Sequence, residues 1–187
     1  MGTLRIIAGQ ARGRKLVTPT GRTVRPTAQR VRQAVFDVLG QFFQGERVLD
    51  LYAGSGAMGI EALSRGAGFA TFVEVDPAAL RAIQSNLRHV GWEDRARVVR
   101  QDALHFLRGA RGADYDLVFV DPPYRDSPAA ALEALGALGL GEGARVVVEH
   151  DAGFAPRERY GNLRMEDARR YGGTHVTIFG AGSEESP

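Results

Sequence analysis

The segment FVDPPY at residues 119–124 brings together residue types that could form part of a ligand site. Its apolar residues are typical of a buried strand. The two prolines must end that strand at Asp121, because proline fixes its own φ angle and cannot donate to a β-ladder. The pattern therefore puts a carboxylate acceptor, a rigid turn and the aromatic ring of Tyr124 together at the end of a strand.

Acidic residues end the other predicted strands as well. In a doubly wound parallel sheet, the carboxyl ends of the strands form the ligand crevice. One acid at the end of a strand would be unremarkable, whereas five predict a row of carboxylates around one edge of the sheet. The strand-ending segments VLD, FVE, RQD, FVD and VVE put these acids at Asp50, Glu74, Asp102, Asp121 and Glu149.

A glycine-rich loop, AGSGAMG, follows the first of these strands. Gly54, Gly56 and Gly59 fit the G-x-G-x-x-G pattern, which with an acid near residue 74 matches the fingerprint of dinucleotide-binding proteins. However, Asp50 precedes the loop closely, and carboxylates there would repel a pyrophosphate. The same carboxylates favour a cofactor with a positive centre, and S-adenosylmethionine has a cationic sulfonium beside an ammonium, a ribose and an adenine.

These residues predict a division of roles around S-adenosylmethionine. Gly54 and Gly56 let the backbone approach the cofactor, and Asp50 lies near its methionine end. Glu74 accepts hydrogen bonds from the ribose hydroxyls, and Asp102 meets the adenine amino group. The alternatives are a tight turn without a ligand for the glycines, a solvated acid for Glu74, and a helix N-cap for Asp102, which is compatible with adenine binding.

The elements that must position these residues alternate along the chain from about residue 46. With 187 residues, 44% of them hydrophobic, the chain can form one ordinary domain with its own core. Strands that alternate with helices indicate a parallel sheet with crossover helices, in three α/β layers. The segment at 161–180 breaks this rhythm and predicts two antiparallel strands around a Gly-Gly turn, and the last residues form a polar tail.

The N-terminal segment has a charge pattern of its own. Residues 1–36 hold eight basic residues and no acid, whereas the rest of the chain holds 16 basic and 22 acidic residues. This split favours a polyanionic partner for the N-terminal segment, and the alternative is a solvated basic surface. LRIIAG and GRKLVTP predict a β-hairpin, and RPTAQRVRQAVFDVL predicts an amphipathic helix with Thr27 as its N-cap.

Four segments together resemble a known family. LRIIAGQARGRKL, RPTAQRVRQAVFDVL, LDLYAGSGAMGIEALSRGA and FVDPPY are similar to the bacterial small-subunit rRNA guanine-N2 methyltransferases, the RsmD family. The resemblance implies a Rossmann-like class I methyltransferase fold, with a mostly parallel seven-stranded sheet and an antiparallel C-terminal hairpin at its edge. It also implies an RNA-facing N-terminal hairpin and helix over 1–43, a methyltransferase domain over 44–180 and a flexible tail over 181–187.

The resemblance implies the activity and the roles of residues. S-adenosylmethionine would methylate the exocyclic N2 of one guanine in 16S rRNA of the 30S subunit, guanine 966 in the family. Asp121 and the carbonyl of Pro122 would hold the two amine hydrogens, Pro123 would keep the turn rigid, and Tyr124 would stack on a base turned out of its helix. The resemblance adds Ala53, Ser55, Ala103 and Thr27 to the cofactor contacts. The RNA-facing residues would be Arg5, Arg12, Arg14, Lys15, Arg25, Arg30 and Arg32.

Three other functions fit parts of the pattern. DPPY also occurs in DNA adenine-N6 methyltransferases, but these usually carry an additional region that reads a duplex. G-x-G-x-x-G alone suggests an NAD-dependent oxidoreductase, and the basic segment alone suggests a non-catalytic RNA-binding module. The chain has no cysteine, its four histidines lack the spacing of metal ligands, and no apolar run is long enough to span a bilayer. We therefore expect a monomeric cytoplasmic enzyme without a metal.

Overall fold

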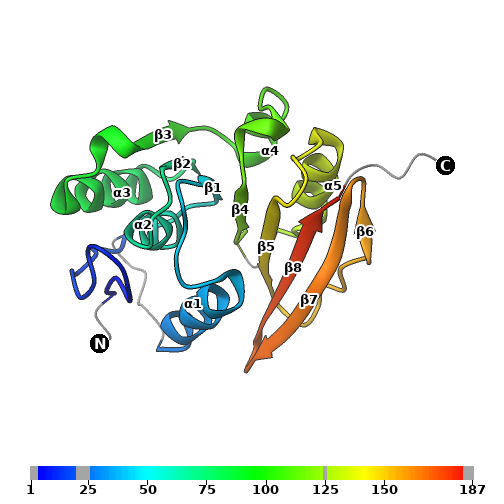
Figure 1. Cartoon of the computed structure of the whole chain (residues 1–187), viewed down its shortest axis with the longest axis horizontal. Helices are drawn as coiled ribbons and strands as arrows, with labels where there is room; N and C mark the ends of the chain where they lie inside the picture. Colours follow the sequence, from blue (N-terminus) through cyan, green and yellow to red (C-terminus); the bar gives the residue numbers. More distant parts are fainter. Residues whose placement is uncertain (1–3, 20–25, 124–125, 183–187) are drawn as a thin grey trace.

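The computed structural model of the chain describes residues 4–19, 26–123 and 126–182, without the side chains of Pro26 and Thr27. An eight-stranded sheet runs through its centre (Figure 1). The strands are β1 (Arg47–Leu51), β2 (Phe69–Glu74), β3 (Ala96–Arg100), β4 (Leu117–Val120), β5 (Arg145–His150), β6 (Arg159–Tyr160), β7 (Leu163–Tyr171) and β8 (Thr174–Ala181).

The strands lie in the order β3-β2-β1-β4-β5-β8-β7-β6. The pairs among β1 to β5 are all parallel, whereas β5 with β8, β8 with β7 and β7 with β6 are antiparallel pairs. This arrangement confirms the mostly parallel α/β sheet with an antiparallel C-terminal edge. The sheet has eight strands rather than the seven expected, because the two-residue β6 adds to its edge. A strand of two residues is too short to show an alternation of apolar and polar residues, so the sequence did not predict it.

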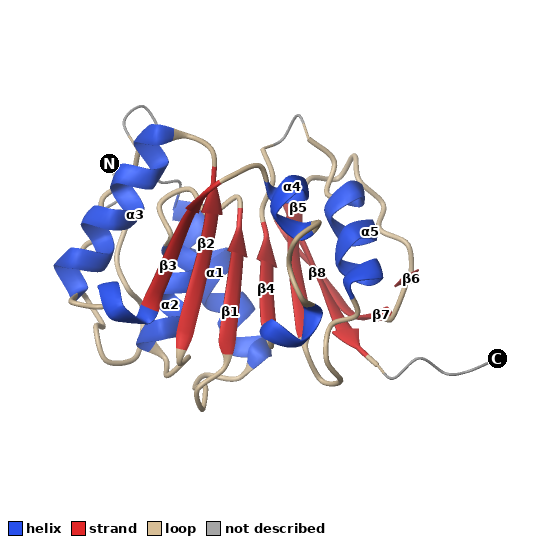
Figure 2. Ribbon diagram, turned by 90° about the horizontal axis from the view of Figure 1, so that it is seen from above, coloured by secondary structure: helices blue, strands red, loops and turns tan. Residues whose placement is uncertain are grey.

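Helices cover both faces of the sheet, and its parallel strands point to one edge (Figure 2). One core joins residues of the first three helices to the sheet, and a second core joins residues of the last two helices to the other face. Asp76 caps α3 (Pro77–Val90) by accepting from the Ala78 N–H at 2.9 Å, and Gly91 ends that helix with φ 77°. The helices are α1 (Pro26–Leu39), α2 (Ala57–Ser64), α3 (Pro77–Val90), α4 (Ala103–Leu107) and α5 (Ala129–Leu138), with short 3-10 turns η1 (Glu93–Arg95) and η2 (Gly112–Asp114).

The N-terminal arm, residues 4–19, folds back on itself and packs on the helices of the first core. Arg5 and Lys15 form an isolated antiparallel bridge, so the predicted hairpin exists as one bridge rather than as two full strands. Leu4, Ile6 and Leu16 are buried in the same core as α1 and α2. The arm is therefore part of the body of the protein.

One buried carboxylate fixes this arm. Glu61 in α2 is fully buried and accepts hydrogen bonds from the backbone N–H groups of Ile7 at 2.8 Å and Ala8 at 3.0 Å. It also accepts from Arg65 Nε at 2.8 Å, and the Nε atom of Arg32 in α1 lies 3.8 Å from its other oxygen. Glu61 thus connects the arm, α1 and α2 through one side chain.

The start of α1 differs from the sequence prediction. The helix begins at Pro26, so Thr27 lies within its first turn and is not the N-cap. Proline is favoured at the first helical position, because its missing N–H has no partner to lose there and its φ angle is already helical. The side chain of Thr27 is outside the described part of the chain, so its contact with the cofactor stays a prediction.

Replacing Glu61 tests whether this carboxylate holds the arm. Glu61→Ala leaves two buried guanidinium groups and two backbone N–H groups without their shared acceptor, so we expect the free energy of unfolding to fall by roughly 3–5 kcal/mol. Glu133→Ala is the control, because its ion pair with Arg157 is more than half exposed and should contribute less than about 1 kcal/mol. Urea unfolding measures both, and equal losses would contradict the assignment.

Candidate active site

Three acids project from one face of the sheet near its carboxyl edge. Asp50 in β1 is in register with Phe72 in β2 and Phe119 in β4. Glu74 and Asp121 follow those two phenylalanines by two positions, and because side chains alternate along a strand, all three acids lie on the same face. The sequence prediction that these acids gather at one edge is therefore confirmed for this set.

Glu149 in β5 extends this set of acids by one strand, because it lies beside Asp121. Val120 pairs with Val148 in the parallel β4–β5 ladder, so the next residues along the two strands, Asp121 and Glu149, lie side by side. Both line the same cavity. Asp102 stands apart, because it follows β3 by two residues and caps α4, where it accepts from the backbone N–H of residue 105 at 2.9 Å.

Asp50 is the most enclosed of these acids, with 3% of its surface exposed. It lies within β1 rather than after it, and its Oδ2 accepts from the Gly59 N–H of α2 at 2.9 Å. The pKa of Asp50 is raised from 3.8 to about 8, mainly by burial and to a smaller extent by the nearby charges of Asp121 and Glu74, while the hydrogen bond from Gly59 opposes the rise. A cation bound at this edge would relieve that repulsion.

The glycine loop approaches the sheet closely. Gly54 and Gly56 have φ angles of 57° and 76°, in the left-handed region that favours glycine. A Cβ atom on Gly59, in the first turn of α2, would lie 2.4 Å from the ring of the buried Phe72, so a side chain here would force that ring to move. Ala53, buried, and Ser55, partly exposed, complete the loop beside the acids.

Glu74 holds this loop against the end of β2. Its Oε2 accepts from the Gly54 N–H at 2.9 Å, and its Oε1 accepts from the N–H groups of Val75 at 2.7 Å and Asp76 at 3.0 Å. A pyrophosphate on a dinucleotide-type loop needs amides such as that of Gly54. Because the Gly54 N–H already donates to the Glu74 carboxylate, it is not available to a phosphate, and this geometry argues against an NAD site.

Two residues of the loop region were not found from the sequence. Tyr52 has a φ angle of 59°, a conformation that costs a non-glycine residue about 1–3 kcal/mol and that gathers at functional sites. Asn86 in α3 is buried and donates to the carbonyls of Ser55 and Val17, both at 2.9 Å. Its polar side chain on the apolar face of an amphipathic helix was the available signal, whereas nothing in the sequence indicates the backbone strain at Tyr52.

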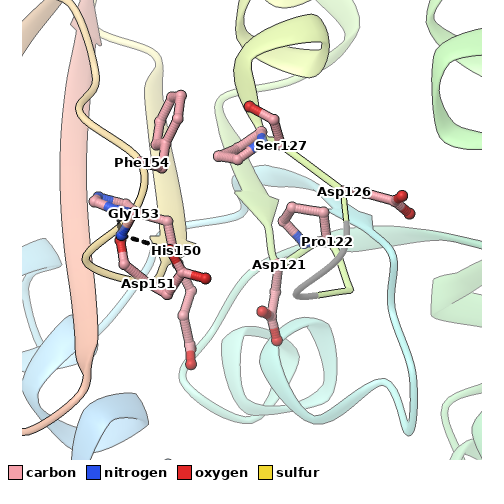
Figure 3. Close-up of a pocket in the computed structure, with 10 residues that line it drawn as sticks. Asp121, Pro122, Asp126, Ser127, His150, Asp151, Gly153 and Phe154 are labelled. Carbon is pink, nitrogen blue, oxygen red and sulfur yellow. Dashed lines mark hydrogen bonds between the residues drawn. The ribbon is translucent and has the colours of Figure 1, made fainter.

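The turn after β4 borders a cavity of about 290 Å³ (Figure 3). Pro122 is buried, and the carbonyl of Pro123 accepts from the Asp126 N–H at 2.7 Å, which closes the turn. Tyr124, predicted to stack on a base, lies outside the described residues. The lining residues are Asp121, Pro122, Asp126, Ser127, Pro128, Glu149, His150, Asp151, Gly153 and Phe154.

His150 and Phe154 form the wall of this cavity opposite Asp121 and Pro122 (Figure 3). The ring nitrogens of His150 are 2.8 Å from the Asp151 carbonyl and 3.0 Å from the Thr177 hydroxyl, so Nδ1 carries the hydrogen and Nε2 accepts. Burial lowers the pKa of His150, which keeps the ring neutral. The ring of Phe154 meets it edge-on with 5.2 Å between centroids.

The basic residues of the N-terminal segment divide into two groups. Arg5, Arg12, Arg14, Lys15 and Arg30 are exposed, and Arg25 lies outside the described residues. Arg32 is 4% exposed and faces Glu61, so the prediction that it contacts RNA is wrong. The helical pattern of α1 turns Arg32 toward the core beside the buried Val31, and the buried carboxylate compensates its charge.

Within the described residues, no group of three or more histidine, aspartate or glutamate side chains could hold a metal ion. The same residues contain no helix long and apolar enough to cross a membrane.

The raised pKa of Asp50 predicts a dependence of stability on pH. A carboxyl whose pKa is higher in the folded state binds its proton more tightly there, so the folded state loses stability as pH rises from about 4 to about 8. Asp50→Asn cannot ionise and should remove this loss, whose slope is at most about 1.4 kcal/mol per pH unit. Urea unfolding at several pH values measures it, with the exposed Asp94→Asn as control. Parallel curves for wild type and Asp50→Asn would contradict the assignment.

Comparisons with known proteins agree with this geometry. The putative rRNA methyltransferase YlbH of Bacillus subtilis is 38% identical over 180 residues, which cover 94% of this chain and 98% of that protein. The ribosomal RNA small subunit methyltransferase D of Escherichia coli is 45% identical over 124 residues, which cover 66% of this chain and 62% of its own length. The solved structure of the putative methyltransferase yhhF from Escherichia coli has a TM-score of 0.84 and 34% identity, and covers 98% of this chain and 100% of its own.

The family described as Conserved hypothetical protein 95 matches residues 4–180. The match spans the arm, the glycine loop, the strand-end acids and the turn after β4. The chain therefore belongs to this family of S-adenosylmethionine-dependent RNA methyltransferases. YlbH and ribosomal RNA small subunit methyltransferase D are its relatives in that family.

Proposed function

We propose that the protein transfers a methyl group from S-adenosylmethionine to the exocyclic N2 of one guanine in 16S rRNA, guanine 966 in the family. The observation that carries this proposal is the cavity beside the Asp-Pro-Pro turn, which adjoins the face where Asp50, Glu74 and Asp121 gather. The name of the Escherichia coli relative supplies the class of RNA.

The residues around the glycine loop fit the cofactor. Gly54 and Gly56 leave the backbone accessible, and the acids supply a negative field. Glu74 and Asp102 keep acceptor capacity for the ribose hydroxyls and the adenine amino group, since a carboxylate can accept about four hydrogen bonds. Bound S-adenosylmethionine supplies an electrophilic methyl group on a positive sulfur. Ala53, Ser55, Ala103 and Thr27 complete the proposed cofactor site.

The turn after β4 aligns the amine. The lone pair of an exocyclic amine is conjugated with its ring, so it attacks poorly unless the nitrogen is held in position. Asp121 and the carbonyl of Pro122 accept the two N–H hydrogens, which directs the lone pair toward the methyl group. Transfer forms the N2–carbon bond, breaks the sulfur–carbon bond and releases one N2 proton along the hydrogen bond to Asp121.

The N-terminal arm and α1 together provide the surface for the RNA partner. Arg5, Arg12, Lys15 and Arg30 present exposed cations, and Arg14 donates to the His89 carbonyl at 2.9 Å, which ties the arm to the end of α3. Phosphate contacts of this kind position an enzyme on RNA without reading its sequence. We propose that the protein acts as a monomer on the 30S subunit in the cytoplasm.

The proposed function is tested by incubating the purified protein and labelled S-adenosylmethionine with 30S subunits. The subunits are taken from a strain that lacks the gene for this protein, so that the target guanine is unmethylated. Label from S-adenosylmethionine should enter 16S rRNA as N2-methylguanine in nucleoside analysis. Asp121→Ala should reduce transfer by at least about 100-fold while S-adenosylhomocysteine still binds, because the side chain faces the acceptor. Asp94→Ala, an exposed acid of η1 that does not line the cavity, is the control. Duplex DNA is offered in a parallel reaction, and label that appears there as N6-methyladenine, with none in the 30S subunits, would refute the proposal in favour of a DNA adenine methyltransferase.

The arm predicts a salt dependence of RNA binding. Arg12→Ala/Lys15→Ala removes two exposed cations, so binding to 16S rRNA should weaken and the slope of log K against log salt should fall by roughly one to two. Arg108→Ala/Arg111→Ala is the control, because these exposed arginines follow α4 on the opposite face of the sheet. Filter binding at several salt concentrations measures both, and an unchanged slope in the arm variant would remove the arm from the RNA surface.

A further inference from the structure

Glu149 has no part in the transfer described above, although it lines the cavity that receives the base. Continuing the β4–β5 register puts it directly beside Asp121, and neighbouring strands are about 4.8 Å apart. Both residues follow the buried Phe119 and Val147 by two positions, so both carboxylates leave the sheet on the same face. The cavity therefore presents two adjacent acceptors rather than one.

The rest of the cavity limits how a base can enter. Pro122 and Phe154, on opposite sides of the cavity (Figure 3), and Pro128 supply apolar surfaces. The edge-on contact with Phe154 and the two hydrogen bonds of His150 fix the position of the His150 ring. His150 is neutral, so it does not cancel the charge of the two carboxylates. A ring held between such walls must present hydrogen-bond donors to Asp121 and Glu149.

Guanine and adenine differ at this edge. Guanine carries two neighbouring donors, the N2 amine and N1–H, whereas N1 of adenine has a lone pair and no hydrogen. Two carboxylates side by side match the pair of donors on guanine, and the second carboxylate repels an N1 lone pair.

We propose that Glu149 is a specificity-determining residue that accepts the N1–H of the target guanine while Asp121 holds its N2 amine. This inference rests on the proposed function and deepens it, because it explains how the cavity selects guanine. Removing the N1 hydrogen while keeping the 2-amine should therefore cost the enzyme most of its activity. The base 2-aminopurine has this property.

The test compares guanine with 2-aminopurine at the modified position of 16S rRNA reconstituted into 30S subunits. Wild-type enzyme should prefer guanine in kcat/KM by roughly 10- to 100-fold, the range for one matched hydrogen bond to a base edge. Equal transfer to both bases would overturn the role of Glu149 while leaving N2 methylation intact. Absence of transfer to guanine would instead refute the proposed function, so the two failures are distinguishable.

Glu149→Gln provides the matching variant. Its amide can accept from N1–H of guanine or donate to N1 of 2-aminopurine, so we expect the preference to fall to within about 3-fold. Glu142 is exposed and precedes the first residue of β5, at the opposite end of the strand from Glu149. The control variant Glu142→Gln should therefore keep the wild-type preference for guanine. An unchanged preference in Glu149→Gln would overturn the proposal. Loss of transfer to both bases, with S-adenosylhomocysteine still bound, would also overturn it, because glutamine keeps an acceptor for N1–H.

Discussion

Electrostatic repulsion among acids at the carboxyl edge of the sheet is the constraint on which the site depends. Parallel strands in register bring Asp50, Glu74, Asp121 and Glu149 to one face, and α2 covers Asp50 so that it is nearly removed from water. In the empty protein this arrangement disfavours the ionised form of Asp50, because its carboxylate is buried and lies near the charges of Asp121 and Glu74. The ionised form becomes favourable when a cation lies among these acids, and a methyl donor with a positive sulfur is such a cation.

Hydrogen bonds then couple this acidic edge to the rest of the molecule. Glu74 holds the glycine loop from the side of β2, and Asn86 holds it from the side of α3. Asn86 also exchanges two hydrogen bonds with the backbone of Val17 in the arm. The surface proposed to meet RNA and the loop proposed to meet the cofactor are therefore joined through one buried amide. A movement of the arm would therefore act on the position of the glycine loop through the hydrogen bonds of Asn86.

The sequence predicted the parts of the fold that follow from local pattern. Alternating strands and helices and the Gly-Gly hairpin depend on periodicity and turn chemistry, and the structure confirms them. Strand-end acids were predicted to meet because parallel strands share an edge. The burial of Arg32 was not predicted, since its partner Glu61 is 29 positions away and only tertiary packing brings them together. His150 ends β5 and Phe154 lies in the loop after it, where the sequence has no helical or strand periodicity from which their contact could be predicted.

The acidic edge also explains why the glycine pattern alone misleads. G-x-G-x-x-G describes a tight turn between a strand and a helix, and such a turn can serve a pyrophosphate or a cationic cofactor. What separates them is the charge around the turn, and here the amide of Gly54 is bonded to a carboxylate. Charge near the loop is therefore more informative about the ligand than the glycines are.

Calorimetry of cofactor binding in buffers with different ionisation enthalpies tests the central claim most directly, because it counts the protons that binding releases. At pH 7 Asp50 is mostly protonated, since its pKa is about 8, and a cation beside it should drive the proton off. We predict that S-adenosylmethionine releases close to one proton, and that S-adenosylhomocysteine, whose sulfur is neutral, releases far less. Equal proton release by the two ligands would contradict the claim that these carboxylates are arranged around a positive sulfur.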